Sequence, residues 1–295
     1  MYDLIGSIVL YKNSPKQILE AVTSFLNTQL KVGLYLIDNS PEHRLLESCK
    51  DHRVTYIFNG RNLGFGAGHN LAMNVSQNKA KYHVVLNPDI YFEPGVLETL
   101  FSFACSRPDI GLLMPKVLNA DGSVQRLCKR LPTPSDLFIR RFLPQVFKTL
   151  VKERLARYEF RDQDLNSVLS VPVLSGCFMM INGAALREVG MFDERYFMYM
   201  EDVDLCRRIH RRFKTIYFPK VVVYHHYAKG SYRSVRLMMH HIVSASRYFH
   251  KWGWFFDPER VDINRESPDD TYLRSHIGNA VAPIIRPDFL GRARR

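Results

Sequence analysis

Short apolar runs alternate with stretches of helical periodicity along the first third of the chain. The apolar runs are rich in β-branched and aromatic residues, so they predict buried strands at Leu4–Tyr11, Leu34–Ile37, Val54–Phe58 and Tyr82–Leu86. Helical spacing of the apolar positions predicts helices at Pro15–Leu30 and Asn70–Gln77. Strands that alternate with helices favour an α/β fold, in which helices flank a mostly parallel central sheet.

The middle of the chain combines apolar residues at helical spacing with many arginines and lysines. Leu137–Arg157 has this pattern, and Pro144 either begins a second helix within it or kinks the first. A basic amphipathic helix is typical of a membrane surface, but a helix packed on the domain with a solvated basic face gives the same pattern. The sequence leaves both interpretations open.

The last part of the chain returns to strands and then becomes helical. Apolar runs predict strands at Val171–Ile181 and Val221–Tyr224, and Val235–Trp252 predicts a helix. The arginine-rich end, Ile284–Arg295, predicts a disordered segment or an electrostatic arm. We therefore expect one domain over residues 1–232, with a basic helical insertion at about 135–161, and a C-terminal helical extension with a basic tail over 233–295.

Composition narrows the class of protein and of partner. With 46% hydrophobic and 24% charged residues, the 295-residue chain is typical of a soluble globular protein. A net charge of +12 favours an anionic partner, which could be nucleic acid, nucleotide phosphates or an acidic membrane. The alternative is that the positive charge only keeps the protein soluble. Five widely spaced cysteines without a CxxC motif suggest neither a disulfide framework nor a zinc knuckle, which favours a reducing compartment. Without a signal-peptide pattern or a bilayer-spanning apolar run, we expect a soluble or peripheral protein.

Polar residues follow three of the predicted strands at the point where each strand ends: Tyr11–Asn13, Asp38–Asn39 and Asn87–Asp89. In parallel α/β sheets, ligands bind beyond these carboxyl ends, so a nucleotide or another polar ligand is expected there. Asp89 suits a hard cation such as Mg²⁺ or Mn²⁺, which takes its remaining ligands from phosphates and water. An ordinary Asn-Pro-Asp turn explains the same residues.

Two further features could contribute to such a site. The glycine cluster Asn62–Asn70 lacks the G-x-G-x-x-G dinucleotide fingerprint and the Walker A lysine, which disfavours a dehydrogenase. Its glycines allow close backbone approach to a ligand, or they form an ordinary loop. His225 and His226 follow the last strand and face opposite sides, so at most one of them can join Asp89 around a metal or a phosphate.

An acidic run predicts the start of a helix. Glu201, Asp202 and Asp204 are followed by arginines. This order agrees with the helix dipole, which favours acidic residues near the beginning of a helix and basic residues near its end. On a helix Glu201 and Asp204 share a face, whereas Asp202 points elsewhere. Asp202 could therefore serve chemistry while its neighbours cap and brace the helix, although acidic first turns are common without any catalytic role.

Taken together, these motifs resemble those of glycosyltransferase family 2, which has the GT-A fold. The motifs occur in the family's order at Tyr11–Asn13, Asp38–Ser40, Asn62–Asn70, Asn87–Asp89, Ser175–Phe178, Gly190–Glu194 and Glu201–Leu205. The resemblance spans about residues 4–232. It is strongest to bacterial rhamnosyltransferases that use dTDP-rhamnose, on the basis of Asn87–Asp89, the region from His225 to Ser231, Tyr248–Phe249 and Lys251–Trp254.

The resemblance implies a role for individual residues. Tyr11 and Asp38 would hold the nucleobase. The positions implied to line the nucleotide or sugar part of the donor are Asn62, Gly66, Asn70 and Asn87. Asp89, with help from His225, would hold Mg²⁺ or Mn²⁺ against the diphosphate, and Asn87 replaces the first acid of the family's usual Asp-x-Asp, which puts strict metal dependence in doubt. Gly176 and Cys177 would lie near the sugar and the acceptor. Asp202 would be the catalytic base, with Glu201 as its orienting neighbour.

The resemblance also implies a reaction. It is an inverting transfer of a sugar, L-rhamnose from dTDP-rhamnose above all, onto a hydroxyl of a glycan or polyprenyl-diphosphate-linked glycan in bacterial surface polysaccharide synthesis. The alternatives are a UDP-sugar donor and a non-catalytic protein that binds nucleotide-sugars or polyanions. Nucleic acid is not expected, because the sequence has no zinc knuckle or RNA-recognition signature. The expected location is the cytoplasm, either free or in peripheral contact with an anionic membrane at the inner face of the cytoplasmic membrane.

Overall fold

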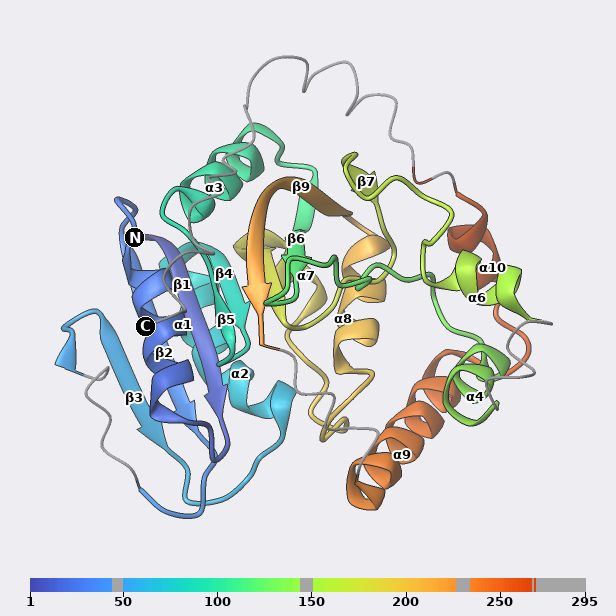
Figure 1. Ribbon diagram of the computed structural model, residues 1–295, viewed down its shortest axis with the longest axis horizontal. Coiled ribbons are helices and arrows are strands. Elements are labelled where there is room, and N and C mark those ends of the chain that lie inside the picture. Colours follow the sequence, from blue (N-terminus) through green and yellow to red (C-terminus); the bar gives the residue numbers. More distant parts are fainter. Residues whose placement is uncertain (44–49, 144–150, 227–233, 267, 269–295) are drawn as a thin grey trace.

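The computed structural model describes residues 1–43, 50–143, 151–226, 234–266 and 268 (Figure 1). Its centre is a nine-stranded sheet with the order β3-β2-β1-β4-β8-β6-β9-β5, and β7 pairs with β9. The strands are β1 (Tyr2–Leu10), β2 (Val32–Asp38), β3 (Val54–Phe58), β4 (Ala80–Leu86), β5 (Ile90–Tyr91), β6 (Ile110–Leu118), β7 (Leu169–Ser170), β8 (Phe178–Asn182) and β9 (Lys214–His225). The predicted α/β class is confirmed.

The direction of the strands changes halfway across the sheet. The first four strands, β3, β2, β1 and β4, pair in parallel as expected. Strand β8 runs antiparallel to both of its neighbours, while β6 and β9 pair in parallel. The sheet is therefore mixed. Four of the five residues of β8 are buried, so its continuous apolar run contained no signal of direction.

Helices cover both faces of the sheet. Helices α1 (Pro15–Leu26) and α3 (Val96–Ser106) bury one face through residues such as Phe25 and Leu100. Helices α2 (Phe65–Lys79), α7 (Gly183–Val189) and α8 (Glu201–His210) bury the other through residues such as Met73, Leu186 and Leu205. This arrangement leaves the carboxyl ends of β1, β2, β4 and β9 at one edge, where the polar motifs lie.

Three sequence-based expectations are corrected. The run Val171–Ile181 is not one strand, because residues 171–177 separate β7 from β8. The helix expected at Asn70–Gln77 begins at Phe65 and contains the last two glycines of the cluster. A Cβ on Gly68 would lie 2.7 Å from a methyl of Val9, so this glycine lets α2 pack closely on the sheet. The expected helix at Pro15–Leu30 ends at Leu26.

The basic insertion forms two helices in the described residues, α4 (Pro134–Phe142) and α6 (Lys152–Tyr158). A capping box of Thr133 and Asp136 begins α4. The prediction about Pro144 lies outside the described residues, as do the predictions about the tail and about the boundary at residues 232 and 233. Helix α9 has the predicted bounds, Val235–Trp252, and α10 (Pro258–Arg265) follows it. In the described part of the chain, no helix has the length and apolarity needed to cross a membrane.

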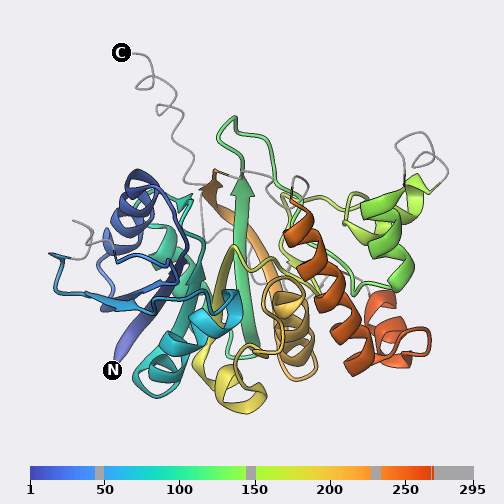
Figure 2. The same cartoon turned by 90° about the horizontal axis from the view of Figure 1, so that it is seen from below.

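The C-terminal helices gather with α4 and α6 beyond α8, at one end of the sheet (Figures 1 and 2). A buried ion pair fastens them to α8. Arg207 of α8 contacts Asp257 at 2.7 Å and Glu259 at 2.6 Å, and its guanidinium lies 4.2 Å from the centre of the Trp252 ring. Asp204, which has no exposed surface, accepts hydrogen bonds from Trp252 and Arg208 and pairs with Lys251 at 2.7 Å. Helix α8 is thus held on its far side by residues about 50 positions later in the sequence.

The ion pair predicts a stability effect. Replacing Arg207 with methionine should cost about 3–5 kcal/mol of unfolding free energy, because it leaves Asp257 buried beside a neutral side chain. The matched control is Arg212→Met on the exposed pair with Glu188, which should cost about 1 kcal/mol or less. Urea unfolding of the two variants measures both values. Equal losses in the two variants would contradict the role given to Arg207.

Candidate active site

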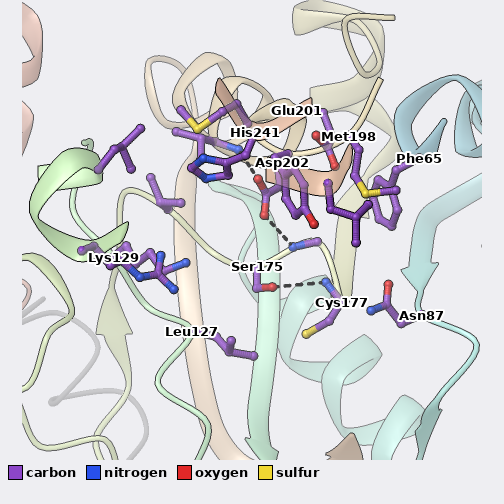
Figure 3. A pocket seen from close by; sticks show the side chains of 18 of the residues that line it. Phe65, Asn87, Leu127, Lys129, Ser175, Cys177, Met198, Glu201, Asp202 and His241 are labelled. Carbon is purple, nitrogen blue, oxygen red and sulfur yellow. Dashed lines mark hydrogen bonds between the residues drawn. The ribbon is translucent and has the colours of Figure 1, made fainter. Parts of the chain in front are cut away.

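A cavity of about 340 Å³ opens where several predicted site residues converge (Figure 3). Asn87 follows β4, Gly176 and Cys177 precede β8, Glu201 and Asp202 begin α8, and His225 ends β9; all six line the cavity. The fold therefore brings together residues that are up to 138 positions apart. Burial raises the pKa of the Cys177 thiol to about 12, so this cysteine stays protonated and is no nucleophile at neutral pH.

One end of the cavity carries Asn87 and His225; Asp89 does not line the cavity itself but lies beside the His225 ring. The Nε2 atom of His225 lies 3.2 Å from Oδ1 of Asp89 and 3.4 Å from the Asn87 amide nitrogen. Gln125 Oε1 lies 3.0 Å from Nδ1 of the same ring, which favours a proton on Nδ1. In that tautomer Nε2 and the carboxylate both present lone pairs to the same point.

This arrangement fits a hard divalent cation. Two facing lone pairs need a cation or a proton between them. Among the residues that the structure describes, no group of three or more histidines, cysteines, aspartates or glutamates could hold a metal ion. Asp89 and His225 would therefore leave most coordination positions to phosphate oxygens and water, as Mg²⁺ and Mn²⁺ accept. His226 faces away, 3.4 Å from Glu20 and stacked on Tyr91, so only one of the two histidines reaches the site, as expected.

The residues expected to hold a nucleobase lie at the same edge of the sheet. Leu10 and Asp38 are paired in the parallel ladder of β1 and β2, so Tyr11 follows directly beside Asp38. The buried Asp38 carboxylate accepts hydrogen bonds from the Ser40 backbone at 2.8 Å and from the Tyr56 hydroxyl at 2.6 Å. Tyr11 is exposed. The binding of a base by these two residues stays a prediction.

Three residues of the glycine region, the half-buried Asn62 and the buried Gly66 and Asn70, do not line the cavity. Asn62 accepts a hydrogen bond from the Gly64 backbone, and a Cβ on Gly66 would lie 2.8 Å from Phe192. The Asn70 amide bonds to both backbone polar groups of Phe192 and to the Glu194 carboxylate. These contacts position the segment that leads into α8. Their role in donor binding stays a prediction, while Phe65, which the sequence did not single out, does line the cavity.

Asp202 is held in place by its neighbours and points into the cavity (Figure 3). Its Oδ2 accepts a hydrogen bond from the Gly176 backbone at 3.1 Å. A Cβ on Gly176 would lie 3.4 Å from the Asp202 Cβ and 3.3 Å from the Phe65 ring, so glycine permits this close approach. Tyr199 and Met200, which lead into α8, both have positive φ angles, a strained conformation that is concentrated at functional sites.

The other two acids of the run differ from Asp202, as the helical spacing predicted. Asp204 is buried in the ion-pair network described above. Glu201 lies against the cavity but is 5% exposed, and its Oε2 has no hydrogen-bond partner among the described residues. Burial and then the charge of Asp202 raise the Glu201 pKa well above its ordinary value, which favours the protonated form of this carboxyl, a form that can donate a hydrogen bond. An orienting role for Glu201 stays a prediction.

Comparison with known proteins identifies the family. Residues 7–190 match the model of glycosyl transferase family 2. N-acetylglucosaminyl-diphospho-decaprenol L-rhamnosyltransferase of Mycobacterium tuberculosis is 30% identical over 271 residues, which is 85% of each chain. Rhamnosyltransferase WbbL of Escherichia coli K12 is 26% identical over 72% of this chain and 79% of its own.

A solved structure supports the fold. The crystal structure of GalNAc-T7 with UDP, GalNAc and Mn²⁺ matches with a TM-score of 0.58 and 14% identity, over 94% of this chain. The match covers 56% of that longer chain, and at this identity it bears on the fold alone. The predicted GT-A fold is confirmed by this likeness together with the family match. The chain belongs to glycosyltransferase family 2.

Proposed function

We propose that the protein transfers L-rhamnose from dTDP-rhamnose, with inversion, to a hydroxyl of a glycan carried on a polyprenyl diphosphate, in bacterial surface polysaccharide synthesis. The observation that carries the proposal is the Asp202 carboxylate, which faces the same cavity as Asn87 and His225. The names of two relatives support rhamnose, and the mycobacterial name supports an acceptor with a lipid diphosphate. A UDP-sugar is the alternative donor.

The proposed reaction is a single displacement. Asp202 takes the proton of the acceptor hydroxyl while that oxygen bonds to C1 of the sugar, and the bond from C1 to the diphosphate oxygen breaks on the opposite face. The Gly176 backbone N–H holds the carboxylate in position without neutralising it. Asp89 and His225 would hold Mg²⁺ or Mn²⁺, which offsets the charge of the leaving diphosphate.

The base assignment predicts a loss of turnover. Asp202→Asn keeps the shape of the side chain but cannot accept the proton, so kcat should fall about 10²- to 10⁴-fold while the affinity for dTDP stays within about 2-fold. Release of dTDP during transfer, and calorimetry with dTDP, measure the two quantities. Asp262→Asn on the exposed face of α10 is the matched control and should keep wild-type turnover.

Near-normal turnover of a folded Asp202→Asn variant would remove Asp202 from this role. The same pair of proteins tests the alternative of a non-catalytic binding protein. With a panel of dTDP- and UDP-sugars and no acceptor, slow hydrolysis by the wild type alone supports an enzyme. Hydrolysis that is absent from both proteins supports a binding protein.

The metal assignment predicts a loss of affinity. Asp89→Ala removes the carboxylate that faces His225, so it should weaken Mg²⁺- or Mn²⁺-dependent dTDP binding by about 10-fold or more. The matched control is Glu20→Ala, because Glu20 contacts the neighbouring His226 outside the cavity. Calorimetry with and without the metal measures the effect. Unchanged affinity and an unchanged metal response would contradict the assignment.

The cavity wall supports work at a membrane surface on the cytoplasmic side. Leu137 and Arg140 of α4 and Tyr158 of α6 line the cavity, and α6 carries exposed basic residues such as Lys152 and Arg157. Such helices would bring the acceptor end of the cavity to an anionic bilayer.

Membrane contact is testable with liposomes. The wild-type protein should co-sediment with vesicles that contain anionic lipid, less with neutral vesicles, and the binding should weaken as salt rises. Absence of binding to both kinds of vesicle would refute the peripheral location.

A further inference from the structure

The cavity has a second polar end, formed by Lys129 and Arg140. In Figure 3, Lys129 and Asn87 lie on opposite sides of Asp202. The backbone of Lys129 is fixed, because its N–H and C=O both bond to Val173, at 3.0 and 3.1 Å. Its side chain thus extends into the cavity from a firm support.

The spacing along the chain separates this end from the metal end. Gln125, Leu127 and Lys129 occupy alternate positions and all line the cavity. Gln125 bonds to the His225 ring, whereas Lys129 is four residues further on. At about 3.3 Å per residue of extended chain, the backbones of Gln125 and Lys129 are on the order of 13 Å apart. A diphosphate held at Asp89 and His225 therefore leaves Lys129 to another group.

The charges of the side chains at this end of the cavity favour the binding of an anion. The Lys129 ammonium forms no ion pair or side-chain hydrogen bond with the residues that the structure describes. Burial, and then the charge of Arg140, lower the Lys129 pKa to about 8, against smaller opposing effects of Asp202, Glu159 and Cys177. Arg140 lies 3.4 Å from Glu159, but that carboxylate also pairs with Arg161 at 2.6 Å. Lys129 and Arg140 thus place two partly buried cations side by side at this end of the cavity, a pair that a bound anion would stabilise.

We propose that Lys129 and Arg140 form an anion subsite that binds the diphosphate linker of the acceptor and so positions the acceptor hydroxyl at Asp202. This rests on the proposed transfer to a diphosphate-linked glycan. The donor diphosphate is assigned to the far end, and Asp202 lies between the two ends, so an anion at Lys129 belongs to the acceptor. Leu137, Leu237 and Met238 also line the cavity, and their apolar side chains suit the start of a hydrocarbon chain.

A comparison of two acceptor substrates distinguishes an anion subsite at Lys129 from a purely structural role of this residue. Both carry N-acetylglucosamine on the same decyl chain, one through a diphosphate and the other through a neutral glycosidic bond. Lys129→Met should raise KM for the diphosphate acceptor about 10- to 100-fold and leave KM for the neutral acceptor within about 2-fold. Lys129→Arg should restore most of the loss. Lys79→Met, an exposed lysine at the end of α2, is the matched control and should behave as wild type.

A binding measurement keeps the subsite testable if the proposed transfer itself fails. The donor end is first saturated with dTDP and Mg²⁺. Decyl diphosphate should then bind to the wild-type protein, and its affinity for Lys129→Met should be lower by about 10-fold or more. No transfer to either acceptor refutes the proposed function, whereas no binding of decyl diphosphate refutes the subsite. Equal KM increases for both acceptors in Lys129→Met would also refute it, because a merely structural role predicts that result.

Discussion

The buried contact between Arg207 and the acids Asp257 and Glu259 is the constraint on which the site depends. It holds α8 against the C-terminal helices, while Leu205 and Ile209 of the same helix pack in the core. Because α8 begins with Glu201 and Asp202, holding the helix also holds the proposed base against Gly176. The same C-terminal extension supplies part of the cavity wall through α9. The extension is therefore part of the site, although it lies after the residues that match the family model.

The helix then makes neighbouring acids chemically different. Asp204 is neutralised by Arg208, Lys251 and the Trp252 ring nitrogen, and it serves to anchor the helix. Glu201 is buried without a cationic partner in the described part of the chain, which raises its pKa and favours the protonated form. Asp202 lines the cavity together with Glu201, but its carboxylate is less buried and keeps hydrogen bonds from the backbone. One turn of helix thus yields an anchor, an acid whose protonated form is favoured, and a half-buried carboxylate at the cavity, and the last of these is the best suited to accept a proton.

Local periodicity explains what could be predicted from the sequence. The separation of Asp202 from its neighbours, the opposite faces of His225 and His226, and the bounds of α9 all follow from the 3.6- and 2-residue repeats of helix and strand. The direction of β8 and the place of Lys129 could not be predicted, because both depend on pairing between segments far apart in the chain. The packing of the α2 glycines could not be predicted for the same reason: Gly66 and Gly68 meet Phe192 and Val9, which no local pattern reveals.

The central claim is that one carboxylate acts as a base in a single displacement across a cavity with a donor end and an acceptor end. Its most direct test is the anomeric configuration at C1 of the transferred sugar, read by NMR from the product of dTDP-rhamnose and a diphosphate-linked acceptor. A single displacement predicts the configuration opposite to that of the donor. Retention would contradict the account, since a single displacement in which the acceptor oxygen and the leaving diphosphate lie on opposite faces of C1 must invert that centre.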